Sequence, residues 1–135
     1  MEKDSQMLKE NKKSFKRFIK SFKYCAEGIR YAFYHEQNII VMLVIGILTL
    51  LLGLIFDITM YERLIIILTI GVVLSLEMIN TAIEAATDLI VDKKQAPLAK
   101  VAKDCASGAV GIMSIFAAII GLSIYLPKIF ELLGW

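Results

Sequence analysis

Three long apolar runs follow one another along the chain, and each is long enough to cross a bilayer as a helix. The first, from Ile39 to Phe56, contains no charged residue, and the third, from Cys105 to Leu126, is equally uncharged. The middle run starts at Leu64 and becomes polar in its second half, from Glu77 onward. A hydrocarbon core about 30 Å thick takes about 20 helical residues to cross. The pattern therefore predicts three spanning helices, over about 38–56, 62–90 and 100–127.

The residues before the first span follow a different pattern. Residues 1–13 are polar, and we expect them to form a mobile leader that precedes an N-cap at Ser14. From Phe15 to Phe33 apolar residues recur at steps of three and four, with lysines between them. This spacing is typical of an amphipathic helix lying in the membrane interface, and it predicts a surface helix over 14–35. A helix that serves only as an anchor would have the same pattern.

Composition agrees with a membrane protein rather than a soluble one. The chain has 135 residues, of which 58% are hydrophobic, whereas soluble domains average about 45–50%. We therefore expect an all-α integral membrane fold with one domain over 14–135. The formal net charge is only +2, and we expect no nucleic-acid partner.

The basic residues are distributed unevenly, and their distribution predicts the orientation in the membrane. Nine lysines and arginines precede the first span, whereas Arg63 alone lies between the first two spans. The connection before the third span is again basic, with Lys93, Lys94, Lys100 and Lys103. Because basic loops stay in the cytoplasm, we expect a cytoplasmic N-terminus, and an external C-terminus.

The polar residues of the middle span fall on one face of its helix. At about 100° per residue, Asn80, Glu84 and Asp88 lie at about −60°, −20° and +20° from Glu77, and these four residues form the polar stripe. The stripe rises about 16 Å from its first residue to its last. An ionisable side chain at the bilayer centre costs at least about 2.5–3.5 kcal/mol, so carboxylates in a spanning helix indicate function.

The chemistry of the polar stripe allows several interpretations. Carboxylates and carboxamides are oxygen ligands suited to Mg²⁺, and a carboxylate can take the proton of a hydroxyl group. A proton or cation pathway would use the same side chains, and so would a polar seam that joins helices. Because the stripe opens to one side of the membrane only, a pore through the whole bilayer is the less favoured functional interpretation.

Motifs of soluble nucleotide-binding proteins are absent from the sequence. The chain has neither a Walker A glycine-lysine loop nor a G-x-G-x-x-G segment. If ATP binds, the candidates are basic residues near the cytoplasmic face, above all Lys103 beside Asp104, and Arg17 on the surface helix. A basic side chain at this level can also simply extend to the membrane interface.

Two segments of the chain carry a specific signature. The first is Glu77-Met-Ile-Asn80-Thr-Ala-Ile-Glu84-Ala-Ala-Thr-Asp88, and the second is Ala99-Lys-Val-Ala-Lys103-Asp104-Cys-Ala-Ser-Gly-Ala-Val110. Together they closely resemble the paired signature of the bacterial diacylglycerol kinase and undecaprenol kinase family. The resemblance covers nearly the whole chain after the leader, including Arg17, Tyr24, Gly28, Arg30 and the junction from Glu36 to Asn38.

The resemblance implies roles for the polar stripe. Glu77 matches the proposed catalytic base, which accepts the proton of the lipid hydroxyl group, and Asn80 matches a residue of the same cluster. Glu84 and Glu36 match the carboxylates that hold Mg²⁺ on the phosphates of ATP. Asp88 lies where the stripe reaches the nucleotide.

The resemblance also implies roles outside the stripe. Lys103 and Asp104 match the pair that contacts the nucleotide, and Arg17 and Tyr24 match surface-helix positions that close the site. Three further residues are expected to serve the lipid substrate: Ser21, Arg30 and Ser107. The family assembles as a homotrimer whose sites are shared between neighbouring subunits, so the resemblance implies that this chain is also its own partner.

These observations predict a lipid kinase of the bacterial cytoplasmic membrane, which transfers the γ-phosphoryl group of ATP to a lipid primary alcohol. Undecaprenol is the expected substrate, because the junction from Glu36 to Asn38 and the ending from Gly121 to Lys128 resemble the Gram-positive branch of the family, whose members favour this polyprenol. The segment from Ile39 to Val44, which offers no donor for the ester carbonyls of diacylglycerol, points the same way. The alternatives are a diacylglycerol kinase and, outside enzymes, a small proton or cation channel subunit or a structural adaptor. One departure from the Gram-positive branch, Ile39-Ile-Val-Met in place of a basic or histidine position, leaves contacts to the lipid head group open.

Overall fold

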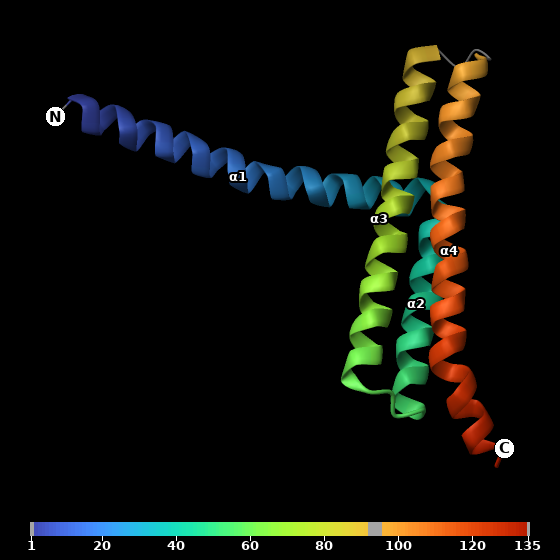
Figure 1. Cartoon of the computed structure of the whole chain (residues 1–135). Helices are drawn as coiled ribbons and strands as arrows, with labels where there is room; N and C mark the ends of the chain where they lie inside the picture. The colour runs from blue at the N-terminus through green and yellow to red at the C-terminus, as the bar shows by residue number, and fades with distance from the viewer. Residues whose placement is uncertain (1, 92–95, 135) are drawn as a thin grey trace. The chain divides into compact units, whose positions relative to one another are not determined.

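The computed structural model describes residues 2–91 and 96–134, with side chains from residue 14 onward. Every element in this part of the chain is a helix (Figure 1): α1 (Glu2–His35), α2 (Gln37–Ile55), α3 (Met60–Val91) and α4 (Pro97–Leu132). The last three are long and apolar enough to cross a membrane. The predicted all-helical fold with three spanning helices is therefore confirmed.

The chain divides into two compact units, one up to His35 and one from Glu36 onward. The first unit is the helix α1, which begins at Glu2 and thus includes residues that the sequence suggested would form a leader. No glycine or proline interrupts residues 2–13, and residues such as Lys, Glu, Gln and Leu favour helix. The expected mobility of residues 1–13 stays a prediction.

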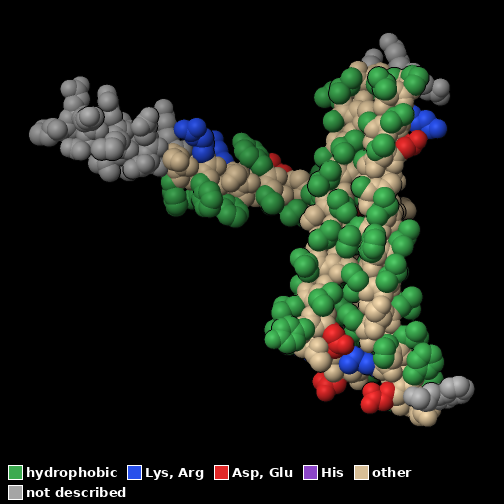
Figure 2. Space-filling view, viewed as in Figure 1, with side chains coloured by type: hydrophobic (Ala, Val, Ile, Leu, Met, Phe, Trp, Pro, Cys, Tyr) green, Lys and Arg blue, Asp and Glu red, His purple; other side chains and the backbone are tan. Residues whose placement is uncertain are grey.

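The second unit, which we call the spanning unit, contains α2, α3 and α4 side by side (Figure 1). At 1.5 Å per residue, the 19 residues of α2 make about 28 Å, close to the thickness of a hydrocarbon core. The 32 residues of α3 and the 36 of α4 make about 48 and 54 Å, so both extend beyond it. Figure 2 shows hydrophobic side chains along the sides of these helices and charged side chains near their ends.

The connection between α2 and α3 is fixed by two capping motifs, and we call this end of the spanning unit the loop end. Asp57 adopts a positive φ of 46°, and the N–H of Ile58 donates to the carbonyl oxygen of Gly53 at 3.2 Å. This is the Schellman arrangement that ends a helix. Thr59 and Glu62 then form a capping box, because the N–H of Thr59 donates to Glu62 Oε2 at 2.7 Å and the N–H of Glu62 donates to Thr59 Oγ1 at 3.3 Å.

A small buried core lies next to the loop end. It consists of Ile58, Ile66, Ile124 and Tyr125. The hydroxyl group of Tyr125 donates to the carbonyl oxygen of Thr49 at 2.6 Å, which ties α4 to α2. The core therefore joins all three spanning helices at this end.

The helix α4 contains two prolines, one in its first turn and one in its interior. Pro97 occupies the first turn, where a missing N–H costs nothing. Pro127 was expected to close the third span, and α4 continues through it to Leu132, so the helix is longer than the predicted span, whose boundary stays a prediction. A proline inside a helix removes one hydrogen bond without always ending the helix, and Figure 1 shows the ribbon changing direction near its red C-terminal end.

Candidate functional site

The polar stripe of α3 lies at the opposite end of the spanning unit from the loop end, and we call this the polar end. Glu77 is 1% exposed and Asn80 is 6% exposed, whereas Glu84 is half-buried and Asp88 is exposed. The amide of Asn80 donates from Nδ2 to Glu84 Oε1 at 3.1 Å. The four side chains of the predicted stripe thus follow one face of α3, from the buried carboxylate of Glu77 to the exposed carboxylate of Asp88.

The start of α2 supplies the polar neighbours of Glu77. Glu36, Asn38 and Glu84 all lie near enough to act on the Glu77 carboxyl group. Glu36 has an extended backbone (φ −114°, ψ 110°) and separates α1 from α2. Because Asn38 belongs to the first turn of α2, Glu77 lies beside the start of that helix.

Two buried oxygens of the stripe have no hydrogen-bond partner among the residues that the structure describes. They are Oε1 of Glu77 and Oδ1 of Asn80. Most buried polar atoms in proteins are paired, and an unpaired one costs about 1–3 kcal/mol. Thr81 does not relieve them, because its hydroxyl group donates to the backbone carbonyl of Glu77 at 3.0 Å. The polar end is therefore built to receive a donor from outside this part of the chain.

Charged residues of α4 lie beside the exposed part of the stripe. Lys103 Nζ is 2.5 Å from Asp88 Oδ1 and joins α3 to α4. Lys100 Nζ lies 4.0 Å from Asp104 Oδ2, one turn apart on the same helix. Three of the residues that the sequence assigned to the nucleotide thus lie in two ion pairs at the polar end.

For five other predicted site residues, the structure gives no contact that tests the predicted role. Ser107 on α4 is exposed. On α1, Arg17 and Tyr24 are exposed, Ser21 donates to its own helix at the carbonyl of Phe18, and Arg30 lies over the ring of Tyr34 at 5.5 Å. These five expected site residues, Arg17, Ser21, Tyr24, Arg30 and Ser107, keep their roles as predictions. Lys93 and Lys94 lie outside the described residues.

Within residues 14–91 and 96–134, no three His, Cys, Asp or Glu side chains are grouped to hold a metal ion. Glu36 and Glu84 are the two carboxylates whose charge acts on Glu77 at the polar end. Mg²⁺ is commonly held by one or two protein carboxylates together with substrate phosphates and water. Such a pair fits a metal that arrives with a nucleotide better than one that is bound permanently.

Two features were not predicted from the sequence, one at this site and one at the loop end. Asn38 was assigned to a helix junction, yet it is one of the polar neighbours of Glu77. The capping box of Thr59 and Glu62 was also missed, although a T-x-x-E spacing before an apolar run is its usual signature.

Comparison with known proteins places this geometry in one family. The family model for prokaryotic diacylglycerol kinase matches residues 23–125. The chain is 41% identical over 121 residues to an undecaprenol kinase of Bacillus subtilis (strain 168), covering 90% of this chain and 98% of that protein. It is 34% identical over 113 residues to a diacylglycerol kinase of Synechocystis, covering 84% of this chain and 65% of that protein.

These matches include the polar stripe and the charged residues of α4 that lie beside it. The channel and adaptor interpretations of the stripe are therefore set aside in favour of phosphoryl transfer, which the matched family performs on lipids. The chain is a multi-pass membrane protein that belongs to the prokaryotic diacylglycerol kinase family of lipid kinases.

Proposed function

We propose that the polar end transfers the γ-phosphoryl group of ATP to the primary hydroxyl group of undecaprenol at the cytoplasmic side of the membrane. The observation that carries this proposal is the buried Glu77 carboxyl group, one oxygen of which has no partner among the described residues. A lipid hydroxyl group would supply the missing donor. Glu77 would then accept its proton as the oxygen attacks phosphorus, the role of a general base.

Other residues of the polar end would position the reaction. Asn80 holds Glu84 through the 3.1 Å hydrogen bond, which keeps the second carboxylate at a fixed place on the stripe. Its own unpaired oxygen is a further acceptor for the substrate. Phosphoryl transfer depends mainly on positioning and electrostatic stabilisation, and this arrangement provides both without a covalent enzyme intermediate.

Glu36 and Glu84 would hold Mg²⁺ together with the ATP phosphates. They suit this role because they are carboxylates, one just before α2 and one on α3, that both act on the Glu77 carboxyl group, and Mg²⁺ prefers oxygen ligands. When bound, the ion would neutralise charge on the transferring phosphoryl group. Lys103, Asp104 and Asp88 would contact the nucleotide, with Arg17 and Tyr24 of α1 closing the site.

The surface helix and the subunit arrangement complete the proposal. In the described part of α1 the aromatic residues Phe15, Phe18 and Phe22 are exposed, and Figure 2 shows hydrophobic and basic side chains on different sides of this helix. Such a helix suits the membrane interface, where Ser21 and Arg30, with Ser107 of α4, would meet the lipid. We propose a homotrimer, because a single chain offers few walls around a site for ATP, lipid and metal.

The orientation follows from the basic residues before α2. Nine lysines and arginines precede the first spanning helix, which by the positive-inside rule favours a cytoplasmic N-terminus and an external C-terminus. The polar end is formed where α2 begins and α3 ends, so this orientation gives it access to cytoplasmic ATP.

The choice of undecaprenol has two supports. The relative that matches over nearly its whole length is named an undecaprenol kinase. In addition, the first turns of α2, from Ile39 to Val44, carry no polar side chain, so they offer no donor to the ester carbonyls of diacylglycerol. Leaving such groups unpaired costs about 1–3 kcal/mol each.

The test compares both lipid alcohols in one assay. Purified protein in bicelles with Mg²⁺ and ATP receives undecaprenol or diacylglycerol at equal mole fraction, and ADP formation is followed from the start. We expect ADP formation that depends on added lipid and is several-fold faster with undecaprenol. A several-fold preference for diacylglycerol would overturn the substrate assignment, and ADP formation that ignores both lipids would overturn the lipid kinase function.

A further inference from the structure

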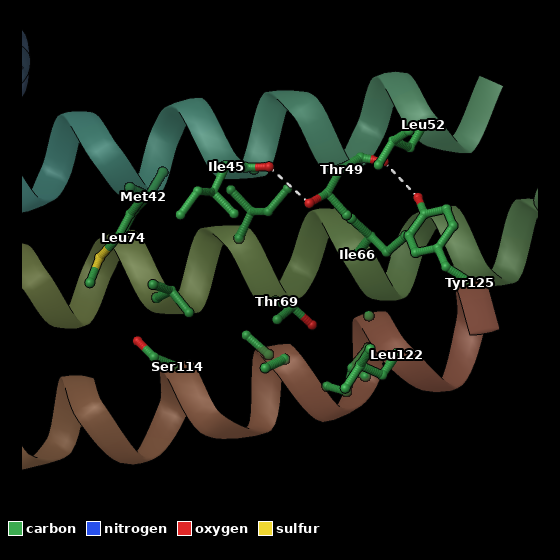
Figure 3. A pocket seen from close by; sticks show the side chains of 17 residues that line it. Met42, Ile45, Thr49, Leu52, Ile66, Thr69, Leu74, Ser114, Leu122 and Tyr125 are labelled. Atoms are coloured by element: carbon green, nitrogen blue, oxygen red, sulfur yellow. Dashed lines mark hydrogen bonds between the residues drawn. The ribbon is translucent and has the colours of Figure 1, made fainter. Parts of the chain in front are cut away.

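An apolar cavity of about 540 Å³ lies between α2, α3 and α4 in the spanning unit (Figure 3). Its walls include parts of α2 from Met42 to Leu52, of α3 from Ile66 to Leu74 and of α4 from Ser114 to Tyr125. At 1.5 Å per residue these segments extend about 12–16 Å along the helices. Protein interiors hold few voids larger than a water molecule, whereas ligand sites measure about 300–1,000 Å³. A cavity of this size therefore calls for an occupant.

Hydroxyl groups at the walls do not make the cavity polar. Thr49 Oγ1 donates to the carbonyl oxygen of Ile45 at 2.8 Å, and Thr69 Oγ1 donates to that of Ile65 at 2.8 Å. Tyr125 donates its hydroxyl proton to the carbonyl oxygen of Thr49 at 2.6 Å, and Figure 3 marks this bond together with that of Thr49. These three hydroxyl groups each donate to a backbone carbonyl oxygen, and Ser114 adds a fourth hydroxyl group to the wall. The remaining walls are mainly aliphatic, so the cavity suits a hydrocarbon.

The cavity continues the face of α3 that carries the polar stripe. At about 100° per residue, the wall residues Ile66, Ile70 and Val73 lie at about −20°, +20° and −40° from Glu77. Leu74, also in the wall, precedes Glu77 by three residues, a rise of about 4.5 Å. The same face of α3 therefore changes within one turn from the proposed catalytic carboxylate to the wall of an apolar cavity.

We propose that this cavity holds the hydrocarbon tail of the lipid alcohol whose hydroxyl group meets Glu77. The inference rests on the proposed lipid kinase function. With its hydroxyl group at the stripe, a lipid that follows this face of α3 away from the polar end enters the cavity directly. The cavity starts within one helical turn of Glu77. A substrate tail requires this position, because the tail is attached to the hydroxyl group at Glu77, whereas a helix of a second copy could occupy a cavity anywhere along α3.

The cavity also separates lipids by tail length. A tail of a few carbons ends near Leu74, whereas a long chain reaches the walls formed by Thr69 and Ile66 and gains apolar contacts there. Filling the cavity with protein atoms should therefore weaken binding of long-tailed alcohols and leave short ones unaffected.

Two glycines of α4 provide matched variants for the test. A Cβ atom at Gly121, in the cavity wall, meets no atom within 4 Å, and the same holds at Gly111, which is exposed and not a wall residue. Leucine should therefore fit at both positions. Gly121→Leu fills the cavity, and Gly111→Leu adds the same side chain elsewhere on the same helix.

The experiment uses a long-chain polyprenol that carries a photoreactive diazirine about 10 Å from its hydroxyl group. Wild type and both variants are irradiated with this probe in bicelles without ATP, and labelled peptides are identified by mass spectrometry. We expect labelling of wall residues between Ser114 and Tyr125, such as Ala118 and Ile120, in wild type and Gly111→Leu, and a several-fold loss in Gly121→Leu. In the kinase assay Gly121→Leu should raise KM several-fold for undecaprenol and leave KM unchanged for a short-chain prenol.

Three outcomes would overturn the cavity assignment. One is equal labelling of this segment in wild type and Gly121→Leu, and another is labelling confined to exposed residues such as Ile115 and Ile119. The third is an unlabelled cavity in wild type together with altered assembly size in Gly121→Leu, which would assign the cavity to a second copy. Because labelling needs no phosphoryl transfer, a labelled but inactive wild type would contradict the proposed function alone.

Discussion

At the loop end of the spanning unit the polar side chains satisfy one another, whereas at the polar end two buried oxygens are unpaired among the described residues. Thr59 and Glu62 exchange hydrogen bonds, and Glu62 Oε2 also lies 3.5 Å from Lys128 Nζ. Oε1 of Glu77 and Oδ1 of Asn80 have no such partner there. Each unpaired buried atom costs about 1–3 kcal/mol until it receives a donor, a cost that the paired side chains of the loop end do not carry.

The buried side chains also differ between the loop end and the polar end. Near the loop end Ile58 is 3% exposed and covers Gly53 so closely that an added Cβ would lie 2.5 Å from Ile58 Cδ1. At the polar end a carboxylate, that of Glu77, is as fully buried as the neighbouring apolar side chain of Ile39. Proteins tend to break local rules of stability where function requires it. The comparison therefore assigns stability to the loop end and chemistry to the polar end.

The largest effect is expected from removing the proton acceptor. Glu77→Gln keeps the size of the side chain, so the protein should still assemble, but kcat should fall about 10²–10⁴-fold. The matched control is Glu62→Gln, the same change at the loop end of the same helix, for which we expect a rate close to wild type. Initial rates of lipid phosphorylation check both. A Glu77→Gln enzyme that keeps most of its activity would remove Glu77 from the role of base.

A smaller effect is expected for the metal. Glu84→Gln and Glu36→Gln each remove one ligand charge, so the Mg²⁺ concentration at half-maximal rate should rise about tenfold or more. Glu27→Gln, on the exposed surface of α1 beside Lys23, serves as the control and should leave the Mg²⁺ requirement unchanged. A magnesium titration at saturating ATP measures this. Unchanged curves for both variants would argue against metal ligation by these glutamates.

The smallest effect on catalysis is expected at the loop end. Thr59→Ala removes the N-cap of α3, which accepts the N–H of Glu62 at 3.3 Å, and the free energy of unfolding should fall by about 0.5–2 kcal/mol. The rate per folded molecule should not change. Reversible unfolding in mixed micelles gives the first quantity and the kinase assay the second. If the rate falls together with stability, the two ends are not functionally separate.

Much of the fold followed from the hydrophobic pattern. Long uncharged runs leave few alternatives to a spanning helix, because every backbone group must be paired inside the bilayer. The boundaries were less accessible: α3 begins at Met60 because the capping box precedes it, and α4 passes Pro127. Both depend on local hydrogen bonds that the hydropathy pattern does not contain.

The polar stripe was also accessible from the sequence, since the helical period alone places Glu77, Asn80 and Glu84 on one face. The approach of Glu36 and Asn38 to Glu77 was not accessible in this way, because it depends on how α2 packs beside α3. The cavity that extends from the stripe was missed for the same reason. Its walls come from three helices, and no pattern within one helix reveals the space between them.

The central claim is that Glu77 is kept for chemistry and not for stability, and the unfolding of Glu77→Leu tests it most directly. Leucine removes a buried carboxylate that lacks a partner for Oε1 among the described residues, and the Asn38 side chain that interacts with this group is exposed and can bond water instead. Replacing an incompletely paired polar group by an apolar one in this situation is nearly neutral or stabilising. Thermal unfolding of both proteins is measured in the same bicelles without ATP or lipid alcohol. The account predicts an unfolding midpoint that is unchanged or raised by about 2–8 °C, in a protein that no longer phosphorylates lipid. A midpoint that falls by more than that of Thr59→Ala would contradict it, because Glu77 would then be part of a polar seam that holds the helices together.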